Sequence, residues 1–223
     1  MSAASVTLDP LVDRRIEPVS RVFGFDRGVC IDRYYIERFL ASESRCIGGR
    51  VLEIAENTYT RRFGGDRVTR SDVLHVVPGN RKATLVGDLA GGEGLPDDAF
   101  DCVILTQTLQ HIYDTRAVVR TLHRILKPGG AVLATFPGIS QISRYDMDRW
   151  GDFWRFTTLS ARRLFEEVFP PEGVRVESHG NVLVAVAFLH GLATRELEES
   201  ELQHHDPDYP VLITLRATRP PLP

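Results

Sequence analysis

Segments with the length and composition of buried strands alternate with segments of helical periodicity along this chain, and this alternation constrains the fold most. Phe100 to Leu105 is a nearly continuous apolar run, as expected of a parallel strand covered on both faces. In Thr115 to Leu126 the apolar residues recur on one face of a helix, and Ala131 to Phe136 is apolar again. Alternating units of this kind predict an α/β fold with a doubly wound, mostly parallel sheet.

Other segments fit the same pattern. The Lys127-Pro-Gly-Gly130 segment is expected to end the helix before it, because proline and glycine do not continue a helix. Further strands are predicted at 50–54, 67–74, 83–86, 173–178 and 210–217, and further helices at 32–40, 159–169 and 181–194.

Composition and charge exclude several classes of protein. The 223 residues include 30 Asp or Glu and 27 Lys or Arg, so the chain lacks the basic field that bulk nucleic-acid binding requires. The cysteines Cys30, Cys46 and Cys102 form neither a disulfide framework nor a metal-binding pattern, which favours a reducing compartment. Met1 to Pro10 lacks the pattern of a secretory signal, and the longest apolar run, Val182 to Leu189, is too short to span a bilayer. We therefore expect a cytoplasmic protein with neither a nucleic-acid nor a membrane partner.

Acidic residues follow or end successive predicted strands. In doubly wound sheets, ligands bind at the carboxyl ends of the strands. Asp72 lies about 19 residues after Glu53, the spacing at which an acid after the second strand bonds ribose hydroxyls. Asp88 follows the next predicted strand. Asp72 and Asp88 would suit a ribose and an adenine amino group, respectively.

Three sequence motifs carry a resemblance to a known family. They are Leu95-Pro-Asp-Asp-Ala-Phe-Asp-Cys-Val-Ile-Leu105, then Leu109-Gln-His-Ile112 with Asp114, and Arg124-Ile-Leu-Lys-Pro-Gly-Gly-Ala-Val-Leu-Ala-Thr135. On these motifs the chain resembles the class I S-adenosylmethionine-dependent methyltransferases, over roughly Gly49 to Pro137. The C-terminal half, including Arg144 to Trp150, is similar to methyltransferase-like proteins encoded beside glycosyltransferases in bacterial glycan and natural-product gene clusters.

The resemblance implies a Rossmann-like methyltransferase fold with an N-terminal helical arm and a lid insertion. It divides a single domain, 1–223, into an arm and helix at 1–48, a cofactor-binding half at 49–137 and an acceptor-side half at 138–223. The implied cofactor is S-adenosyl-L-methionine. The residues expected to bind it are Glu53, Ala55, Glu56, Asn57, Asp72, Asp88, Leu89, Thr106 and Gln107.

The first loop departs from the family pattern, which is glycine-rich and of the form E-x-G-x-G-x-G. Ala55, Asn57 and Tyr59 stand at the three glycine positions. One interpretation is a reshaped loop in which Glu53 or Glu56 still meets the cofactor's amino group. The other is a loop that has lost the cofactor and leaves only the fold. Before the first strand, Arg33 either pairs with the methionine carboxylate or forms an ordinary ion pair on the helix surface.

Candidate catalytic residues follow the fourth and fifth predicted strands. His111 is positioned to act as a general base, although a histidine here also caps or packs. Ser140 to Thr157 is too long for a simple connection. In this segment, Asp146 and Asp148 are alternative bases. They could also hold a divalent cation, but no metal site is predicted. The residues expected to contact the acceptor are Tyr145, Trp150, Trp154 and Arg155, unless the tryptophans fill a satellite core.

Together these features predict a methyltransferase acting on a hydroxyl of a small polar acceptor, such as a sugar or a glycosylated metabolite. The alternative is a protein with the methyltransferase fold that has lost methyl transfer. Such a protein would serve as a partner of a glycosyltransferase or use the pocket for other chemistry. The expected partner is a small molecule, and a homodimer is possible.

Overall fold

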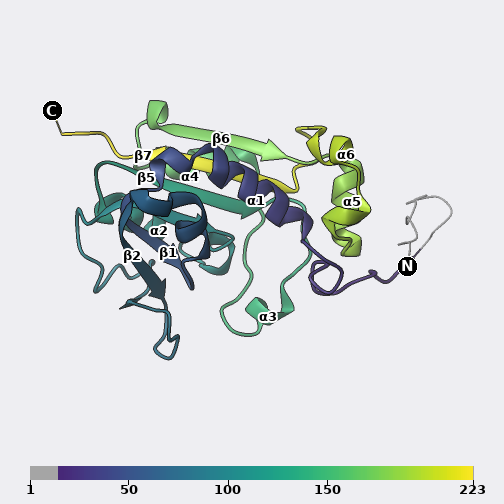
Figure 1. Cartoon of the computed structure of the whole chain (residues 1–223), viewed down its shortest axis with the longest axis horizontal. Coiled ribbons are helices and arrows are strands. Elements are labelled where there is room, and N and C mark those ends of the chain that lie inside the picture. The colour runs from purple at the N-terminus through teal and green to yellow at the C-terminus, as the bar shows by residue number, and fades with distance from the viewer. Residues whose placement is uncertain (1–14, 223) are drawn as a thin grey trace.

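The computed structural model describes residues 15–222, and a seven-stranded sheet runs through it in the order β3-β2-β1-β4-β5-β7-β6 (Figure 1). Residues 1–14 of the predicted arm lie outside the described part. Strands β1 to β5 run parallel to one another, and β7 is antiparallel to both β5 and β6. The α/β fold with a mostly parallel sheet is therefore confirmed. The strands are β1 Gly49–Ile54, β2 Val68–His75, β3 Leu85–Val86, β4 Phe100–Thr106, β5 Leu126–Pro137, β6 Val174–His179 and β7 Leu212–Thr218.

Helices cover both faces of this sheet. The α-helices are α1 Ile31–Ser42, α2 Thr115–Ile125, α3 Arg144–Met147, α4 Thr158–Glu166, α5 Val182–His190 and α6 Glu199–Gln203. Helices α2 and α4 pack into one core, and α1, α5 and α6 pack into a second. A π-helical turn, Thr60–Gly64, follows β1. Short 3-10 helices lie at Ser44–Cys46, Gly65–Arg67, Leu109–His111, Pro171–Gly173 and Thr194–Glu196.

Strand β4 explains why its sequence is continuously apolar. Val103 and Leu105 lie in the core beneath α2 and α4, whereas Cys102 and Ile104 lie in the core beneath α1 and α5. All four are fully buried. Successive side chains of a strand point to opposite faces, so a strand covered on both faces needs apolar residues at every position.

The Lys127 to Gly130 segment follows the end of helix α2, as expected, but it already belongs to β5, whose start was predicted at Ala131. Helix α2 starts at the N-cap Asp114, whose side chain accepts a hydrogen bond from the Ala117 N–H at 2.9 Å. It ends at Ile125, and Leu126 already has extended backbone angles. Because a residue before proline favours extended angles, Lys127 continues the strand into Pro128.

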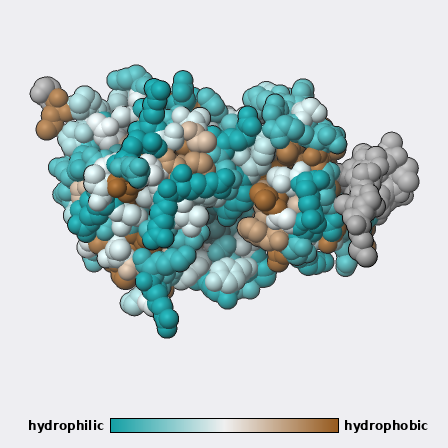
Figure 2. Space-filling view, in the orientation of Figure 1, coloured by the Kyte–Doolittle hydropathy of each residue, from teal (hydrophilic) through white to brown (hydrophobic). Residues whose placement is uncertain are grey.

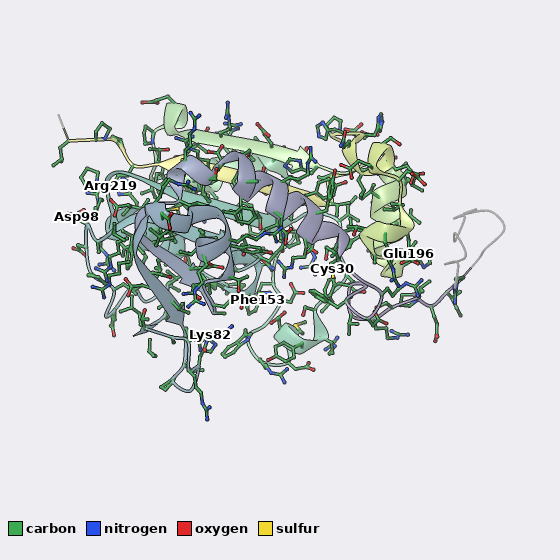
Figure 3. The ribbon with its side chains drawn as sticks, viewed as in Figure 1. Cys30, Lys82, Asp98, Phe153, Glu196 and Arg219 are labelled. Carbon is green, nitrogen blue, oxygen red and sulfur yellow. The ribbon has the colours of Figure 1, made fainter. Side chains whose placement is uncertain are left out.

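The segment before α1 is tied to the end of α5. The Val19 N–H donates to the carbonyl of His190 at 2.8 Å, and Cys30 forms a β-bridge with Ala193. Arg27 forms an ion pair with Glu196. Figure 3 shows Cys30 and Glu196 on the same side of the molecule, where the purple N-terminal segment of Figure 1 passes α5. These contacts fix where α1 begins.

The visible surface is mostly hydrophilic, with small and scattered hydrophobic patches on the face that Figure 2 shows. Among residues 15–222, no helix combines the length and apolar character needed to cross a membrane.

Candidate functional site

A cleft of about 1560 Å³ lies at the carboxyl ends of β1 and β4. These strands are neighbours in the sheet, and the strand order reverses between them. Such a switch point is where doubly wound sheets bind their ligands. The cleft exceeds the range of about 300–1,000 Å³ that is usual for one small ligand, so it has room for more than one.

Glu53 closes the first loop of this cleft on itself. Its buried carboxylate, near the end of β1, accepts hydrogen bonds from the Thr60 N–H and hydroxyl, both at 2.7 Å. The other oxygen accepts from the Tyr59 N–H at 3.2 Å. Burial raises the pKa of Glu53, and these hydrogen bonds offset part of the rise. Both oxygens are engaged by the loop, so Glu53 shapes the site; its contact with a ligand stays a prediction.

Ala55 has the backbone that glycine would normally supply. Its φ is 67°, in the left-handed region, which costs a non-glycine residue about 1–2 kcal/mol. The Ala55 N–H donates to the Leu74 carbonyl at 2.9 Å, and the Ala55 carbonyl accepts from the Asn80 side-chain amide at 2.7 Å. The ring of Tyr59 packs against Phe63, with centroids 6.0 Å apart. The loop therefore keeps a glycine-like bend without glycine.

The other two first-loop candidates have different positions. Glu56 lines the cleft and forms an ion pair with Lys82 at 3.2 Å. Asn57 does not line the cleft, and its contact with the cofactor stays a prediction. Its amide donates to the Ser71 hydroxyl at 3.0 Å, so the side chain is directed toward β2.

Asp72 is also displaced from its predicted place. It lies within β2, paired in register with Leu52, and is buried outside the cleft. Its carboxylate pairs with Arg50 at 2.6 Å and Arg70 at 3.1 Å, and accepts from the Thr84 hydroxyl at 3.0 Å. Burial alone would raise the pKa of Asp72, but these partners hold it below its ordinary value. The carboxylate of Asp72 is therefore engaged within the sheet, and its contact with a ribose stays a prediction.

Replacing Asp72 with Asn is expected to lower the free energy of unfolding at pH 7 by about 1–3 kcal/mol, because Arg50 loses its buried charged partner. Urea unfolding measures the effect. A carboxyl group whose pKa is lowered by folding stabilises the fold at pH values above its pKa in the unfolded chain. The difference in free energy of unfolding between the two chains should therefore disappear as the pH falls below the ordinary 3.8 and through the lowered pKa. The same change at exposed Asp66 is the control, and equal losses at both positions would contradict the assignment.

The remaining predicted cofactor contacts lie where the sequence puts them. Asp88 and Leu89, after β3, line the cleft with Thr106 and Gln107 at the end of β4. Gln107 has a φ of 46°, and its N–H donates to the Thr135 carbonyl at 3.1 Å. Left-handed non-glycine residues at the ends of two adjacent strands are the kind of strain that gathers at functional sites.

His75 is a cleft residue that sequence reasoning missed. It is the last residue of β2 and lines the cleft. Its ring meets Trp150 edge-on, with centroids 5.9 Å apart. The strand was predicted to end one residue earlier, at 74, and correct placement of its end would have identified His75.

The structure brings His111 and Asp146 together across the cleft. Nδ1 of His111 lies 2.8 Å from the Gly151 carbonyl, and Nε2 lies 3.8 Å from Oδ2 of Asp146. The same Oδ2 accepts a hydrogen bond from the Ser143 hydroxyl at 2.6 Å. A carbonyl only accepts, so the hydrogen-bond network assigns the imidazole proton to Nδ1 and leaves Nε2 as an acceptor. This arrangement suits a general base.

The segment Ser140 to Thr157, which we call the lid, contains the expected acceptor contacts. Tyr145 and Trp150 line the cleft with 65% and 38% of their surfaces exposed. The Arg149 guanidinium lies 3.6 Å from the centre of the Tyr145 ring. Phe153 also lines the cleft, as does Lys82, and Figure 3 shows both on one side of the molecule.

Two lid residues are not where the sequence places them. Asp148 is exposed, pairs with Arg144 at 3.2 Å and does not line the cleft. Trp154 stacks on Tyr113 outside the cleft lining, with centroids 5.6 Å apart, and donates to the Ile112 carbonyl at 3.2 Å. Asp148 and Trp154 therefore lie outside the cleft lining, each in contact with a residue that does line it, Arg144 and Tyr113 respectively, and their roles stay predictions.

Arg155 lines the cleft but holds the two ends of the lid together. It bonds Asp152 at 2.5 and 3.0 Å and the Gln141 carbonyl at 2.7 Å. Asp152 also accepts from the Ser143 N–H at 3.1 Å. Burial alone would raise the pKa of Asp152, but the Arg155 guanidinium outweighs it and lowers the pKa. Sequence reasoning missed Asp152, although an Asp and an Arg three residues apart are a recognisable local pair.

Metal ligands are not grouped in the described part of the chain. Across residues 15–222, no three His, Cys, Asp or Glu side chains are arranged to hold an ion. Asp146 and Asp148 contact Ser143 and Arg144 instead of each other.

Comparison with known sequences identifies the central part of the chain. Residues 46–134 match the family model described as "Methyltransferase domain". A ubiquinone/menaquinone biosynthesis C-methyltransferase UbiE from Pectobacterium atrosepticum is 39% identical over 102 residues, which cover 43% of this chain and 37% of the relative. A malonyl-[acyl-carrier protein] O-methyltransferase from Serratia marcescens is 29% identical over 61% of this chain and 55% of its own. The chain therefore matches about a third of the length of the first curated relative and about half of the length of the second.

The fold has solved counterparts. A SAM-dependent methyltransferase from Archaeoglobus fulgidus superposes with a TM-score of 0.55 at 12% identity, covering 84% of this chain and 94% of the other. At this identity the likeness concerns the fold alone.

Proposed function

We propose that this chain, whose residues 46–134 belong to the class I S-adenosylmethionine-dependent methyltransferases, methylates a hydroxyl of a small polar acceptor. The observation that carries the proposal is a single cleft with two kinds of wall. One wall is the switch-point edge with the bends at Ala55 and Gln107, and the other holds His111 and Asp146. The first wall suits a nucleoside cofactor and the second suits an acceptor that must lose a proton.

The residues at the first wall fit S-adenosylmethionine. Asp88 offers a carboxylate to the adenine amino group and Leu89 an apolar surface to its ring, while Ala55 and Gln107 let the backbone approach closely. His75, rather than an acid, stands at the end of β2 beside the expected ribose. When bound, the cofactor supplies an electrophilic methyl group on a sulfonium.

The residues of the second wall are positioned to take up the proton that the acceptor hydroxyl loses. With the cofactor bound, Nε2 of His111 would take the proton that the acceptor hydroxyl loses when its oxygen is methylated. The Gly151 carbonyl fixes the ring through Nδ1, and Asp146 at 3.8 Å stabilises the imidazolium that forms. The lid excludes water and aligns the reactants, which is the main contribution a protein makes to such a displacement.

The acceptor class rests on the lid. Tyr145 and Trp150 present partly exposed aromatic faces to the cleft, beside the polar groups of Asp146 and Arg149. Aromatic faces next to hydrogen-bonding groups suit a sugar ring or a glycosylated metabolite. We infer a hydroxyl of such a molecule as the methyl acceptor.

Binding of S-adenosylhomocysteine is expected to stabilise the fold by about 2.7 kcal/mol when the ligand is at 100 times its Kd. For a domain of this size, that corresponds to a rise in Tm of about 5–10 °C. Thermal unfolding with and without the ligand, together with calorimetric titration, measures both quantities. Adenosine diphosphate is the control nucleotide. Methyl transfer from labelled S-adenosylmethionine to a panel of glycosides would then identify the acceptor.

A second candidate function has one observation in its favour. The acid expected at the end of β2, Asp72, is occupied by Arg50 and lies outside the cleft. A protein with this fold that has lost methyl transfer, and that serves as a partner of a glycosyltransferase or uses the pocket for other chemistry, would not need it. The absence of any thermal shift with both S-adenosylmethionine and S-adenosylhomocysteine would favour this function over the first.

A further inference from the structure

The first turn of α1 places a carboxylate with one unpartnered oxygen at the wall of the cleft. Asp32 lines the cleft, and its Oδ1 atom is buried with no hydrogen-bond partner in residues 15–222. Burial raises the pKa of this carboxyl group more than the nearby Arg33 and helix N–H groups lower it. Buried polar atoms in native structures almost always have partners, so an orphan at the wall of a cleft points to a ligand group.

The next residue carries a positive charge with no carboxylate paired to it. Arg33 lines the same cleft beside Tyr59 and lies over the ring of Phe25 at 6.0 Å. The described residues include no carboxylate that forms an ion pair with Arg33. Two other positively charged side chains that line the cleft do have carboxylate partners. Arg62 pairs with Glu37 at 2.7 Å, and Lys82 pairs with Glu56 at 3.2 Å.

The first loop has little left to offer a charged ligand group. Both carboxylate oxygens of Glu53 accept hydrogen bonds from Tyr59 and Thr60. The Ala55 carbonyl accepts from Asn80, and Glu56 is paired with Lys82. The acidic side chains of this loop are therefore already engaged, whereas Asp32 has an oxygen without a partner.

We propose that Asp32 and Arg33 bind the amino-acid end of S-adenosylmethionine, with Asp32 accepting from the ammonium and Arg33 donating to the carboxylate. This inference rests on the proposed function. A guanidinium forms two parallel hydrogen bonds with a carboxylate, and charge-assisted hydrogen bonds are about twice as strong as neutral ones. Recognition of this end thus moves from the first loop to the start of α1, and the loop keeps only its shape.

Two ligands that differ only at the amino-acid end test the proposal. S-Adenosylhomocysteine carries the ammonium and carboxylate, whereas 5′-methylthioadenosine has the same adenosine and thioether without them. We expect Asp32→Asn and Arg33→Gln each to weaken binding of S-adenosylhomocysteine by about 10- to 100-fold in calorimetry. Binding of 5′-methylthioadenosine should change by less than about twofold. Arg62→Gln, which removes a cleft-lining cation already paired with Glu37, should leave the ratio of the two affinities unchanged.

Stability of the unliganded protein gives a second readout. Asp32→Asn removes a buried negative charge with an unpartnered oxygen, so its Tm should be no lower than that of the unaltered chain. A purely structural role would lower the Tm instead, and would overturn the proposal. Equal weakening of both ligands, or no weakening of either, would also overturn it. If the unaltered chain binds neither ligand, the proposed function itself fails; if it binds both equally well, only the assignment of Asp32 and Arg33 fails.

Discussion

Replacing His111 with Gln is expected to lower kcat by about 10²- to 10⁴-fold, the range that general acid–base catalysis contributes. Gln has a similar reach but cannot take up the hydroxyl proton. The affinity for S-adenosylhomocysteine should change little, because His111 lies with Asp146 on the second wall of the cleft, away from the residues proposed to bind the cofactor. The measurement is steady-state release of S-adenosylhomocysteine with an acceptor found in the glycoside panel.

The matched control for this variant is His204→Gln, at an exposed histidine outside the cleft lining. It should retain the kcat of the unaltered chain. A His111→Gln variant that keeps more than about a tenth of that kcat would remove His111 from the proton transfer and leave it a packing role.

Replacing Asp152 with Ala is expected to release the lid. Its nearly buried carboxylate bonds Arg155 through both oxygens and the Ser143 N–H, so it joins the two ends of the segment. Arg155 would lose its buried partner, and Gly151, next to Asp152 in the chain, would no longer hold the His111 ring. Misalignment of this kind costs about 10²-fold in rate. We expect that loss in kcat/KM, with faster cleavage of the lid in limited proteolysis.

Asp148→Ala is the control within the same segment. Asp148 is exposed and its pair with Arg144 is a surface ion pair, worth about 0–1 kcal/mol. Proteolysis of the lid should therefore proceed as in the unaltered chain. If Asp152→Ala and Asp148→Ala were cleaved at the same rate, Asp152 would not be the residue that closes the lid.

The sequence was most informative where local pattern and tertiary environment agree. The run from Phe100 to Leu105 is apolar at successive positions because β4 has a core on each face, and the structure has a strand there. Asp88, Thr106 and Gln107 follow predicted strands and line the cleft, because parallel strands end at one edge of a sheet.

Asp72 lies inside a strand and not at its end, where the spacing places it. Its spacing from Glu53 matches the expected pattern, but spacing fixes neither the end of a strand nor the partner of a side chain. Strand β2 continues to His75, so Asp72 lies inside it, and Arg50 from β1 holds it there. A carboxylate with a guanidinium at 2.6 Å is committed to that contact.

Sequence alone determined the order of strands and helices, the edge of the sheet that carries the cleft and the resemblance of the central segment to methyltransferases, because each follows from residues close together in the chain. Only the tertiary structure decided which polar side chains face the cleft. His111 meets Asp146 because the lid folds back over the end of β4, and Asp32 and Arg33 meet the first loop because the segment before α1 is anchored to α5. Such contacts join residues far apart in the chain, and their geometry is set by packing rather than by local pattern.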